Sequence, residues 1–413
     1  MMETDNMMPF AFTEGQSPKD KSLNIIKVIG VGGGGSNAVL NMYKQGVHNV
    51  RFAICNTDSQ ALAQADIPVK IQLGSAGLGV GGKPEKGKEE AEASLDVIKT
   101  LFEDDTEMVF ITCGMGGGTG TGAAPVIAGL AKEKGILTVG VVTIPFAFEG
   151  KVKIKKALHG VEEMRKNVDS LLVINNERLC ELYSNEIMRL EDGLAKADEV
   201  ITTAAKSISE IITMRGIINR DFCDVQTVMK NGGDAIMAVG YASGEGRIYK
   251  AFIEALNSPL LNNIEIEKAR RMLYIIYSSD EHQIAISELN EITFFMNDLA
   301  EDIEVLWGAY RDNSLGEQVK VALIATDFTN IKKPIKEQVL ENEYQKELME
   351  MYYGIPKRKK QEAVVEKAAN VVTIEKEESV EEVITEPIEP KIQKQKFLDR
   401  FLKKLNDVVE KID

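Results

Sequence analysis

The chain has 413 residues, 44% of them hydrophobic and 27% charged, an ordinary globular composition with room for two domains and extensions. Its formal net charge of -15 disfavours nucleic acid as the main partner, because phosphate contacts need a basic face. Four cysteines without a C-x-x-C pair and three widely separated histidines disfavour a zinc site or a Ser-His-Asp triad.

The start of the chain carries no sign of export. Residues 1–22 are polar and aperiodic, without the basic start and apolar core of a secretory signal, and we expect a disordered tail. No apolar run approaches the roughly 18 residues that a membrane span needs. We therefore expect a cytoplasmic protein with reduced thiols and no membrane span.

Residues 23–191 alternate between strand-like and helix-like segments. Short apolar runs occupy residues 25–29, 109–113, 138–144 and 170–174, and helical patterns occupy residues 123–134 and 151–166. The alternation predicts an α/β fold with a Rossmann-like parallel sheet wrapped by helices. Binding sites in such folds lie at the carboxyl ends of the strands.

A long helical stripe follows at residues 192–218. Six apolar residues recur there at alternating steps of three and four, which predicts a central core helix: Leu194, Ala197, Ile201, Ala204, Ile208 and Ile211. Residues 219–330 contain strand patterns at 271–277 and 319–325 around a helical pattern near 286–299. They predict a second, smaller α/β domain.

The composition changes after residue 330. Residues 361–390 hold nine acidic and two basic side chains and no aromatic residue, so we expect residues 331–390 to form a flexible linker. Residues 391–413 sum to 7 basic minus 4 acidic side chains, or +3, with Phe397, Phe401, Leu405, Val408 and Ile412 at helical spacing. This amphipathic segment fits docking on a partner protein, packing back onto the globular body, or lying on a membrane surface.

A glycine-rich loop ends the first predicted strand. Gly30, Gly32 and Gly35 satisfy G-x-G-x-x-G, and a helical pattern follows at once. Glycines let backbone amides approach an anion closely, and a helix N-terminus adds free N–H groups and a favourable dipole. Alone, the pattern fits NAD, FAD, ATP or GTP, and also a plain strand-to-helix turn.

A second and more specific loop follows the apolar run at 109–113. Residues 114–122, GMGGGTGTG, hold six glycines in nine positions, which is entropically costly unless something must approach the backbone closely. Thr119 and Thr121 add hydroxyls suited to phosphate oxygens, and we place Pro125 in the first turn of the following helix. Neither loop has Lys-Ser or Lys-Thr after its last glycine, so this is not a Walker A site.

The stretch G-G-G-T-G-T-G after a strand resembles the signature of the tubulin/FtsZ superfamily. Five further stretches are similar to the FtsZ family in the same order: IKVIGVGGGGSNAV at 26–39, NTD at 56–58, GLGVGGKPEKG at 77–87, PFAFEG at 145–150 and NRDFCDVQTVM at 219–229. The resemblance spans about residues 24–328. It implies a GTP-binding domain at 23–191 and a GTPase that uses GTP/GDP and Mg²⁺, polymerises with itself, and forms the bacterial cell-division ring at midcell.

The resemblance also assigns site residues. It places the nucleotide phosphates against the two loops, at Gly33, Gly34, Gly35, Ser36, Asn37, Gly117, Gly118, Thr119 and Gly120. It places the ribose at Glu149, Asn176 near ribose and base, and the guanine at Asp198. Without the resemblance, Asp198 fits a charge at a helix N-terminus better than a base contact. The resemblance assigns no metal ligand from the protein.

Three positions depart from the family's usual residues. Lys83 stands where Asn is common near the γ-phosphate, Lys153 replaces a frequent Arg, and Asn175 replaces the proline before Asn176. Lys153, which we include among the nucleotide-binding residues, keeps the charge but loses bidentate geometry. These differences concern affinity and hydrolysis rate rather than the identity of the ligand.

Asn219, Asp221 and Asp224 form N-x-D-x-x-D after the central helix. Read alone, they fit solvated loop charges or caps as well as catalytic groups. From Asp198 to Asn219 the chain advances 21 residues, about 30 Å as a helix, too far to serve the nucleotide whose base Asp198 touches. They could reach the nucleotide of a neighbour in a head-to-tail filament. The resemblance implies that they position the attacking water, with Mg²⁺ on the phosphates.

Two alternatives to a polymerising GTPase stay open. An NAD-dependent oxidoreductase would use only the first loop and leave the second unexplained. A non-catalytic relative that assembles without hydrolysis would not need Asp221 and Asp224. FtsZ proteins commonly end in a D-I-P-like peptide that docks on membrane-tethering partners. No such stretch occurs here, and we expect residues 391–413 to bind membrane-tethering and other division proteins in its place.

Overall fold

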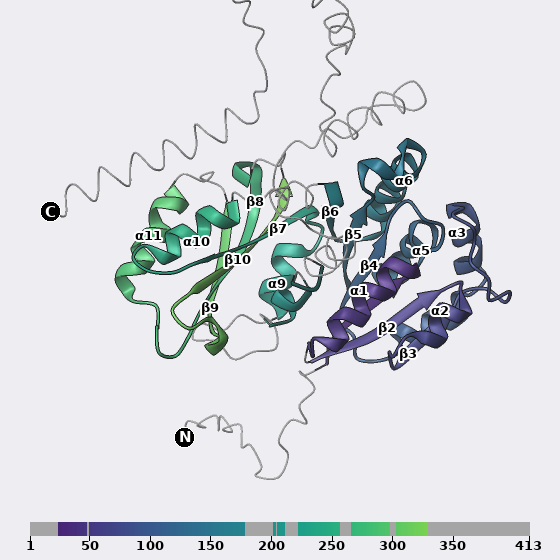
Figure 1. Ribbon diagram of the computed structural model, residues 1–413, viewed down its shortest axis with the longest axis horizontal. Coiled ribbons are helices and arrows are strands. Elements are labelled where there is room, and N and C mark those ends of the chain that lie inside the picture. Colours follow the sequence, from purple (N-terminus) through teal and green to yellow (C-terminus); the bar gives the residue numbers. More distant parts are fainter. Residues whose placement is uncertain are drawn as a thin grey trace, which may run out of the picture.

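The computed structural model describes residues 24–47, 49–177, 201–203, 205–210, 222–256, 266–297 and 303–328. Over these residues the chain forms one sheet of ten strands, in the order β3-β2-β1-β4-β5-β6-β7-β10-β8-β9. Figure 1 shows the two halves of the sheet side by side, each with helices packed on it. The chain crosses from one half to the other between β6 and β7.

The first half of the sheet is parallel. Its strands are β1 (Ile26–Val31), β2 (Val50–Asn56), β3 (Val69–Gln72), β4 (Met108–Gly114), β5 (Leu137–Ile144) and β6 (Ser170–Asn175). All neighbouring pairs among them run in the same direction. β1 is buried along its whole length, as expected of a parallel strand covered on both faces.

Helices cover both faces of this half. They are α1 (Gly32–Lys44), α2 (Ser59–Gln64), α3 (Pro84–Glu92), α4 (Leu95–Lys99), α5 (Thr119–Glu133) and α6 (Lys151–Asn167), with 3-10 turns η1 (Thr100–Phe102) and η2 (Ala147–Glu149). Val28 and Phe110 pack in one core with α1, whereas Ile29 and Ile111 pack in a second core with α5 and α6. Neighbouring residues of a strand thus face opposite layers.

The second half of the sheet is mixed. It contains β7 (Gly233–Ala242), α10 (Arg247–Leu256), η4 (Ile266–Lys268), β8 (Ala269–Ser278), α11 (Ile286–Asn297), β9 (Glu304–Arg311), η5 (Asn313–Leu315) and β10 (Val319–Phe328). β10 runs antiparallel to β7 and β8, and β9 runs parallel to β8. α10 packs in a third core, and the helix that precedes β7, α9 (Phe222–Met229), packs in the same core as α1.

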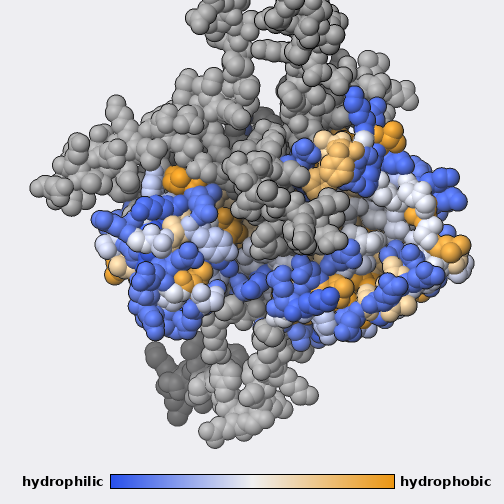
Figure 2. Space-filling model, in the orientation of Figure 1, coloured by the Kyte–Doolittle hydropathy of each residue, from blue (hydrophilic) through white to orange (hydrophobic). Residues whose placement is uncertain are grey.

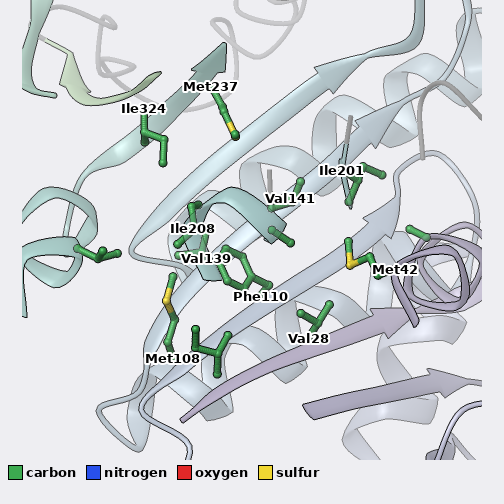
Figure 3. Packing of buried hydrophobic residues seen from close by; sticks show 14 of the residues in the cluster. Val28, Met42, Met108, Phe110, Val139, Val141, Ile201, Ile208, Met237 and Ile324 are labelled. Atoms are coloured by element: carbon green, nitrogen blue, oxygen red, sulfur yellow. The ribbon is translucent and has the colours of Figure 1, made fainter. Parts of the chain in front are cut away.

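The predicted fold class is confirmed. Residues 201–203 and 205–210 are helical, as the central stripe predicts, and Ile201 and Ile208 are buried. Figure 3 shows them in one core with Phe110 of the first half and Ile324 of the second, so this helix packs against both. The other residues of the stripe, and residues 1–22 and 331–413, lie outside the described residues, and the predicted domain boundaries stay predictions.

The predicted place of Pro125 is wrong. α5 begins at Thr119, so Pro125 lies in its second turn and removes one backbone hydrogen bond inside the helix. The Gly-Thr-Gly run belongs to the helix because α3 packs closely on it. A Cβ atom at Gly122 would lie 2.0 Å from the carbonyl oxygen of Pro84. α1 likewise begins within its glycine loop, at Gly32.

The surface of the described residues is mainly hydrophilic on the face that Figure 2 shows. Within the ranges that the structure describes, no helix is both long enough and apolar enough to cross a membrane. Cys55 and Cys113 are buried, and burial raises the pKa of each thiol to about 12, which makes both unreactive.

A buried arginine holds the second half together. Arg247 begins α10, is 8% exposed, and its Nε lies 2.8 Å from Oε1 of Glu288 on α11. Its Nη atoms donate to the carbonyls of Glu317 at 3.1 Å and of His282 and Gln283 at 3.0 Å. One guanidinium therefore ties two helices and two loops together.

We expect Arg247→Met to lower the free energy of unfolding by about 3 kcal/mol, because a half-buried carboxylate and three carbonyls lose their donor. Urea denaturation at pH 7 measures this, with the exposed Lys250→Met on the same helix as control. Burial tends to raise the pKa of Glu288, but hydrogen bonds from Arg247 outweigh it and leave the pKa lowered. A lowered folded-state pKa gives stability that is lost as the pH falls through it, so the difference from the parent protein should shrink below about pH 4. An equal difference at pH 7 and pH 3 would contradict this account.

Candidate functional site

Two glycine loops meet at the carboxyl edge of the parallel strands. The first (residues 30–37) follows β1, and the second (residues 114–122) follows the neighbouring strand β4. A Cβ atom added at Gly32, whose φ is +70°, would lie 2.8 Å from the amide nitrogen of Gly120. The two loops are therefore in contact, with no room for a side chain between them.

The glycines of these loops fall into two groups. Gly35 is required by packing, because a Cβ there would lie 2.2 Å from the carbonyl oxygen of Thr112. Gly33 and Gly117 are different, since apart from the adjoining chain no atom of the described residues would lie within 4 Å of a Cβ at either position. Their backbone faces open space, and a ligand held by both loops would occupy that space.

Two long helices begin in these loops, α1 at Gly32 and α5 at Thr119. Neither has a side-chain cap or an acidic residue in its first turn. The first N–H groups of a helix have no partner inside the helix, and they carry the positive end of its dipole. Two sets of donors thus converge on one place, an arrangement suited to phosphate groups.

A third segment, residues 77–83, closes over the second loop. A Cβ at Gly118 would lie 2.4 Å from Cγ2 of Val80 and 3.1 Å from the amide nitrogen of Lys83. Lys156 Nζ donates to the carbonyl of Gly82 at 2.8 Å. The unusual lysine at position 83 therefore lies beside the second loop, directly before α3.

Hydroxyl groups join the loops to neighbouring strands. The Oγ1 atoms of Thr57 and Thr119 are 2.7 Å apart. We did not predict Thr57 as a site residue, although its place just past the end of β2 was a usable signal. The buried Oγ of Ser36 has no hydrogen-bond partner among the described residues, and buried hydroxyls rarely stay without one. Thr121, the other hydroxyl of the second loop, is 3% exposed, and its oxygen accepts from the amide of Gly116 at 2.8 Å, so it braces the loop.

Charged residues border the second loop where α6 begins. Glu149 and Lys153 form an ion pair, and Glu149 Oε1 also accepts from the amide of Phe146 at 2.9 Å. A Cβ at Gly116 would lie 2.9 Å from Cγ of Lys153, so this pair stands directly against the loop. Asn176, just past β6, is 8% exposed, and its Oδ1 has no hydrogen-bond partner in the part of the chain described.

The remaining predicted site residues are remote or undescribed. Asp198, Asn219 and Asp221 lie outside the described residues, whereas Asp224 stands half-buried in the first turn of α9. α9 ends just before β7, whose Gly233 pairs in parallel with Ser170, the first residue of β6. α9 therefore ends at the amino edge of the sheet, opposite the glycine loops. About 8 Å of helix rise separates Asp224 from the end of α9 at that edge.

Comparison with known proteins agrees with this architecture. The model of the tubulin/FtsZ family GTPase domain matches residues 25–184, and that of the FtsZ family C-terminal domain matches residues 233–329. Cell division protein FtsZ of Porphyromonas gingivalis is 50% identical over 328 residues, 78% of this chain and 70% of that protein. The Aquifex aeolicus FtsZ is 42% identical over 327 residues, 77% and 88% of the two chains. A solved empty FtsZ dimer of M. jannaschii matches with a TM-score of 0.68 and 37% identity, over 76% of this chain and 94% of that one.

The fold, the paired glycine loops and these matches define a GTPase of the tubulin/FtsZ family. Within that class, the chain belongs to the FtsZ family, whose C-terminal domain it also contains. The oxidoreductase alternative is thereby excluded.

The two groups of glycines should respond differently to substitution. We expect Gly33→Val to leave thermal unfolding of the nucleotide-free protein unchanged but to weaken GTP binding at least tenfold, a loss of about 1.4 kcal/mol, because the side chain enters the open space. Gly35→Ala should instead destabilise the fold by about 2 kcal/mol, because its methyl group meets a backbone carbonyl. Titration with a fluorescent GTP analogue and thermal denaturation measure the two effects. Normal GTP affinity in Gly33→Val would show that GTP does not bind against the open side of Gly33.

Proposed function

We propose that GTP drives head-to-tail assembly of this protein into filaments of the cell-division (Z) ring, and that hydrolysis in one copy is completed by the next. The groups supplied in trans would be Asn219, Asp221 and Asp224. One observation carries the proposal: the glycine loops lie at the carboxyl edge of the sheet, whereas α9, whose first turn holds Asp224, ends at the amino edge. A carboxylate at the amino edge can serve a nucleotide only in another molecule. Joining two different surfaces in this way, without closure, produces an open filament.

Exposed apolar residues near the second glycine loop support contact with a second copy. Leu78, Phe148 and Val152 are 75%, 72% and 71% exposed. They belong to residues 77–83, η2 and the start of α6, the segments that border the second glycine loop. Large exposed apolar side chains gathered around one site are typical of surfaces that another protein covers. The solved FtsZ dimer is a relative that associates with itself.

Within the pocket, each predicted residue has a proposed role. The phosphates would contact Gly33, Gly34, Gly35, Ser36, Asn37, Gly117, Gly118, Thr119 and Gly120. Glu149 and Lys153 would border the ribose, Asn176 would lie near ribose and base, and Asp198 would bind guanine. The unpartnered oxygens of Ser36 and Asn176 support these roles, because buried polar atoms rarely remain without a partner.

Magnesium fits this pocket as a partner of the phosphates. Mg²⁺ takes oxygen ligands and, in nucleotide sites, few of them come from the protein. Within the described ranges no group of three His, Cys, Asp or Glu side chains could hold a metal ion, whereas the hydroxyls of Thr57 and Thr119 lie at the pocket. When bound, the ion would neutralise charge on the phosphate oxygens.

Base selection is open to a direct test. A carboxylate at Asp198 can accept from N1–H and the exocyclic amine of guanine, a pair that adenine lacks. We expect the protein to prefer GTP over ATP in competition binding, and Asp198→Ala to reduce that preference at a cost of about 1–3 kcal/mol. Equal affinity of the parent protein for both nucleotides would exclude this role.

Mixing two variants tests hydrolysis in trans. Asp224→Ala should bind GTP and sediment as polymer, yet release phosphate slowly. Adding Gly33→Val, whose carboxylates are intact, should restore phosphate release. At mixed junctions the intact nucleotide site of Asp224→Ala then meets the intact carboxylates of Gly33→Val. Mixing Asp224→Ala with parent protein at matched polymer mass gives the reference rate. Normal phosphate release by Asp224→Ala alone would rule out a catalytic role for Asp224.

We also propose that the protein is cytoplasmic, is recruited to midcell, and binds membrane-tethering and other division proteins through residues 391–413. The basic amphipathic pattern of that segment, behind an acidic stretch, supports this role. Deleting residues 391–413 should leave GTP-driven sedimentation unchanged while abolishing recruitment to the division site. Loss of sedimentation in the truncated protein would instead give the segment a structural role.

A further inference from the structure

Side chains from three strands cap the carboxyl end of α9. Arg271 Nη1 donates to the carbonyls of Thr227 at 3.2 Å and Lys230 at 3.0 Å. Thr326 Oγ1 donates to the carbonyl of Val228 at 2.6 Å, and Ser170 Oγ donates to that of Met229 at 2.5 Å. We call Ser170, Arg271 and Thr326 the α9 socket. The last carbonyls of a helix have no partner inside it, and here side chains satisfy four consecutive ones.

The α9 socket is built from both halves of the sheet. Ser170 begins β6, whereas Arg271 on β8 and Thr326 on β10 are directly paired across the sheet and so point to the same face. Ser170 and Thr326 are fully buried. The guanidinium of Arg271 also suits the negative end of the helix dipole. α9 is therefore fixed to the nucleotide-binding half and to the second half at once.

Two backbone features close the α9 socket. A Cβ at Gly232 would lie 2.7 Å from Oγ of Ser170 and 3.0 Å from Cβ of Thr326, so only glycine fits there. Asp327 lies 3.4 Å from Nη2 of Arg271, and its amide donates to the carbonyl of Gly232 at 2.8 Å. The residues that follow α9 are thus fixed by the same strands, β6 and β10, that bind the end of the helix.

We infer that Arg271 is a positioning residue for GTP hydrolysis: it holds α9 so that Asp224 meets the nucleotide of the neighbouring copy. The inference rests on the proposed function. Asp224 is six residues from Lys230, about 9 Å along the helix, so a tilt of about 10° at the socket would move it by about 1.5 Å. Misplacing a catalytic group by about 1 Å can cost up to about a hundredfold in rate.

Arg271 is the member of the socket best suited to a test. Its side chain is 29% exposed and Asp327's is 36% exposed, so changing either leaves the buried core in place. Arg270 precedes it on β8, is exposed, and serves as a matched control. Arg271 is not part of the nucleotide pocket, which lies at the other edge of the sheet.

The experiment uses the full chain carrying Arg271→Met, Arg271→Lys or Arg270→Met. GTP-analogue affinity, thermal unfolding, sedimented polymer and phosphate released per sedimented subunit are measured for each. We expect Arg271→Met to release phosphate about tenfold more slowly per sedimented subunit, with nucleotide affinity and polymer mass unchanged. Arg271→Lys should recover part of the rate, and Arg270→Met should behave like the parent protein.

Mixing separates positioning in trans from an effect on the variant's own pocket. Arg271→Met mixed with Gly33→Val should recover phosphate release, because the second protein supplies a well-held α9. Arg271→Met mixed with Asp224→Ala should not recover it, because neither protein supplies one. If Asp224→Ala with Gly33→Val recovers activity but Arg271→Met with Gly33→Val does not, the positioning role is wrong and hydrolysis in trans stands. If neither mixture recovers, the proposed function itself fails.

Two further results would bear on the role of Arg271. A normal rate per sedimented subunit in Arg271→Met overturns the inference, and so does a folded variant that no longer sediments. If Arg271→Met does not fold, Asp327→Asn replaces it, because it loosens the guanidinium without removing it. Asp327→Asn is expected to slow phosphate release at unchanged nucleotide affinity, and a normal rate would overturn the inference.

Discussion

The sheet is continuous because β7 extends it in parallel from β6 through three residue pairs, of which Ser170 with Gly233 is the first. Arg165 of α6 lies 2.9 Å from Asp234 of β7 and reinforces this junction. Burial raises the pKa of Asp234 even though Arg165 acts to lower it, so the carboxyl is closely enclosed. Parallel direction at this pairing brings the end of α9 to the amino edge of the sheet. An antiparallel β7 would begin at the carboxyl edge, beside the glycine loops.

The glycine loops combine two requirements that look identical in sequence. Gly35 and Gly122 are small because a backbone carbonyl oxygen of a neighbouring segment lies 2.2 Å and 2.0 Å, respectively, from where a Cβ atom would be. Gly33 and Gly117 are small although nothing in the described chain approaches them. Close packing brings the two helix N-termini together, and open glycines leave them accessible. A nucleotide site of this kind needs both.

Local patterns were sufficient to predict much of this molecule. Apolar runs predicted β1, β4, β5 and β6 to within two residues at either end, and the glycine loops were found by composition alone. The misplacement of Pro125 has a physical cause, since contact with α3 extends α5 backward through residues of poor helix propensity. Thr57 and the α9 socket could not be predicted, because they depend on how strands far apart in sequence align. Arg271 and Thr326 are 55 residues apart, and only the register of β8 with β10 brings them together.

The glycine loops at one edge of the sheet and the end of α9 at the other give every copy an unlike pair of ends. In the proposed filament each completed catalytic centre belongs to a junction, so a row of n copies holds n minus one of them. In that filament the copy whose glycine loops face solvent would retain its GTP until another copy binds. Short oligomers would therefore turn over less nucleotide per copy than long ones, and one tip would differ chemically from the rest. The position of intact GTP along the polymer would therefore mark both its direction and which copies were added last.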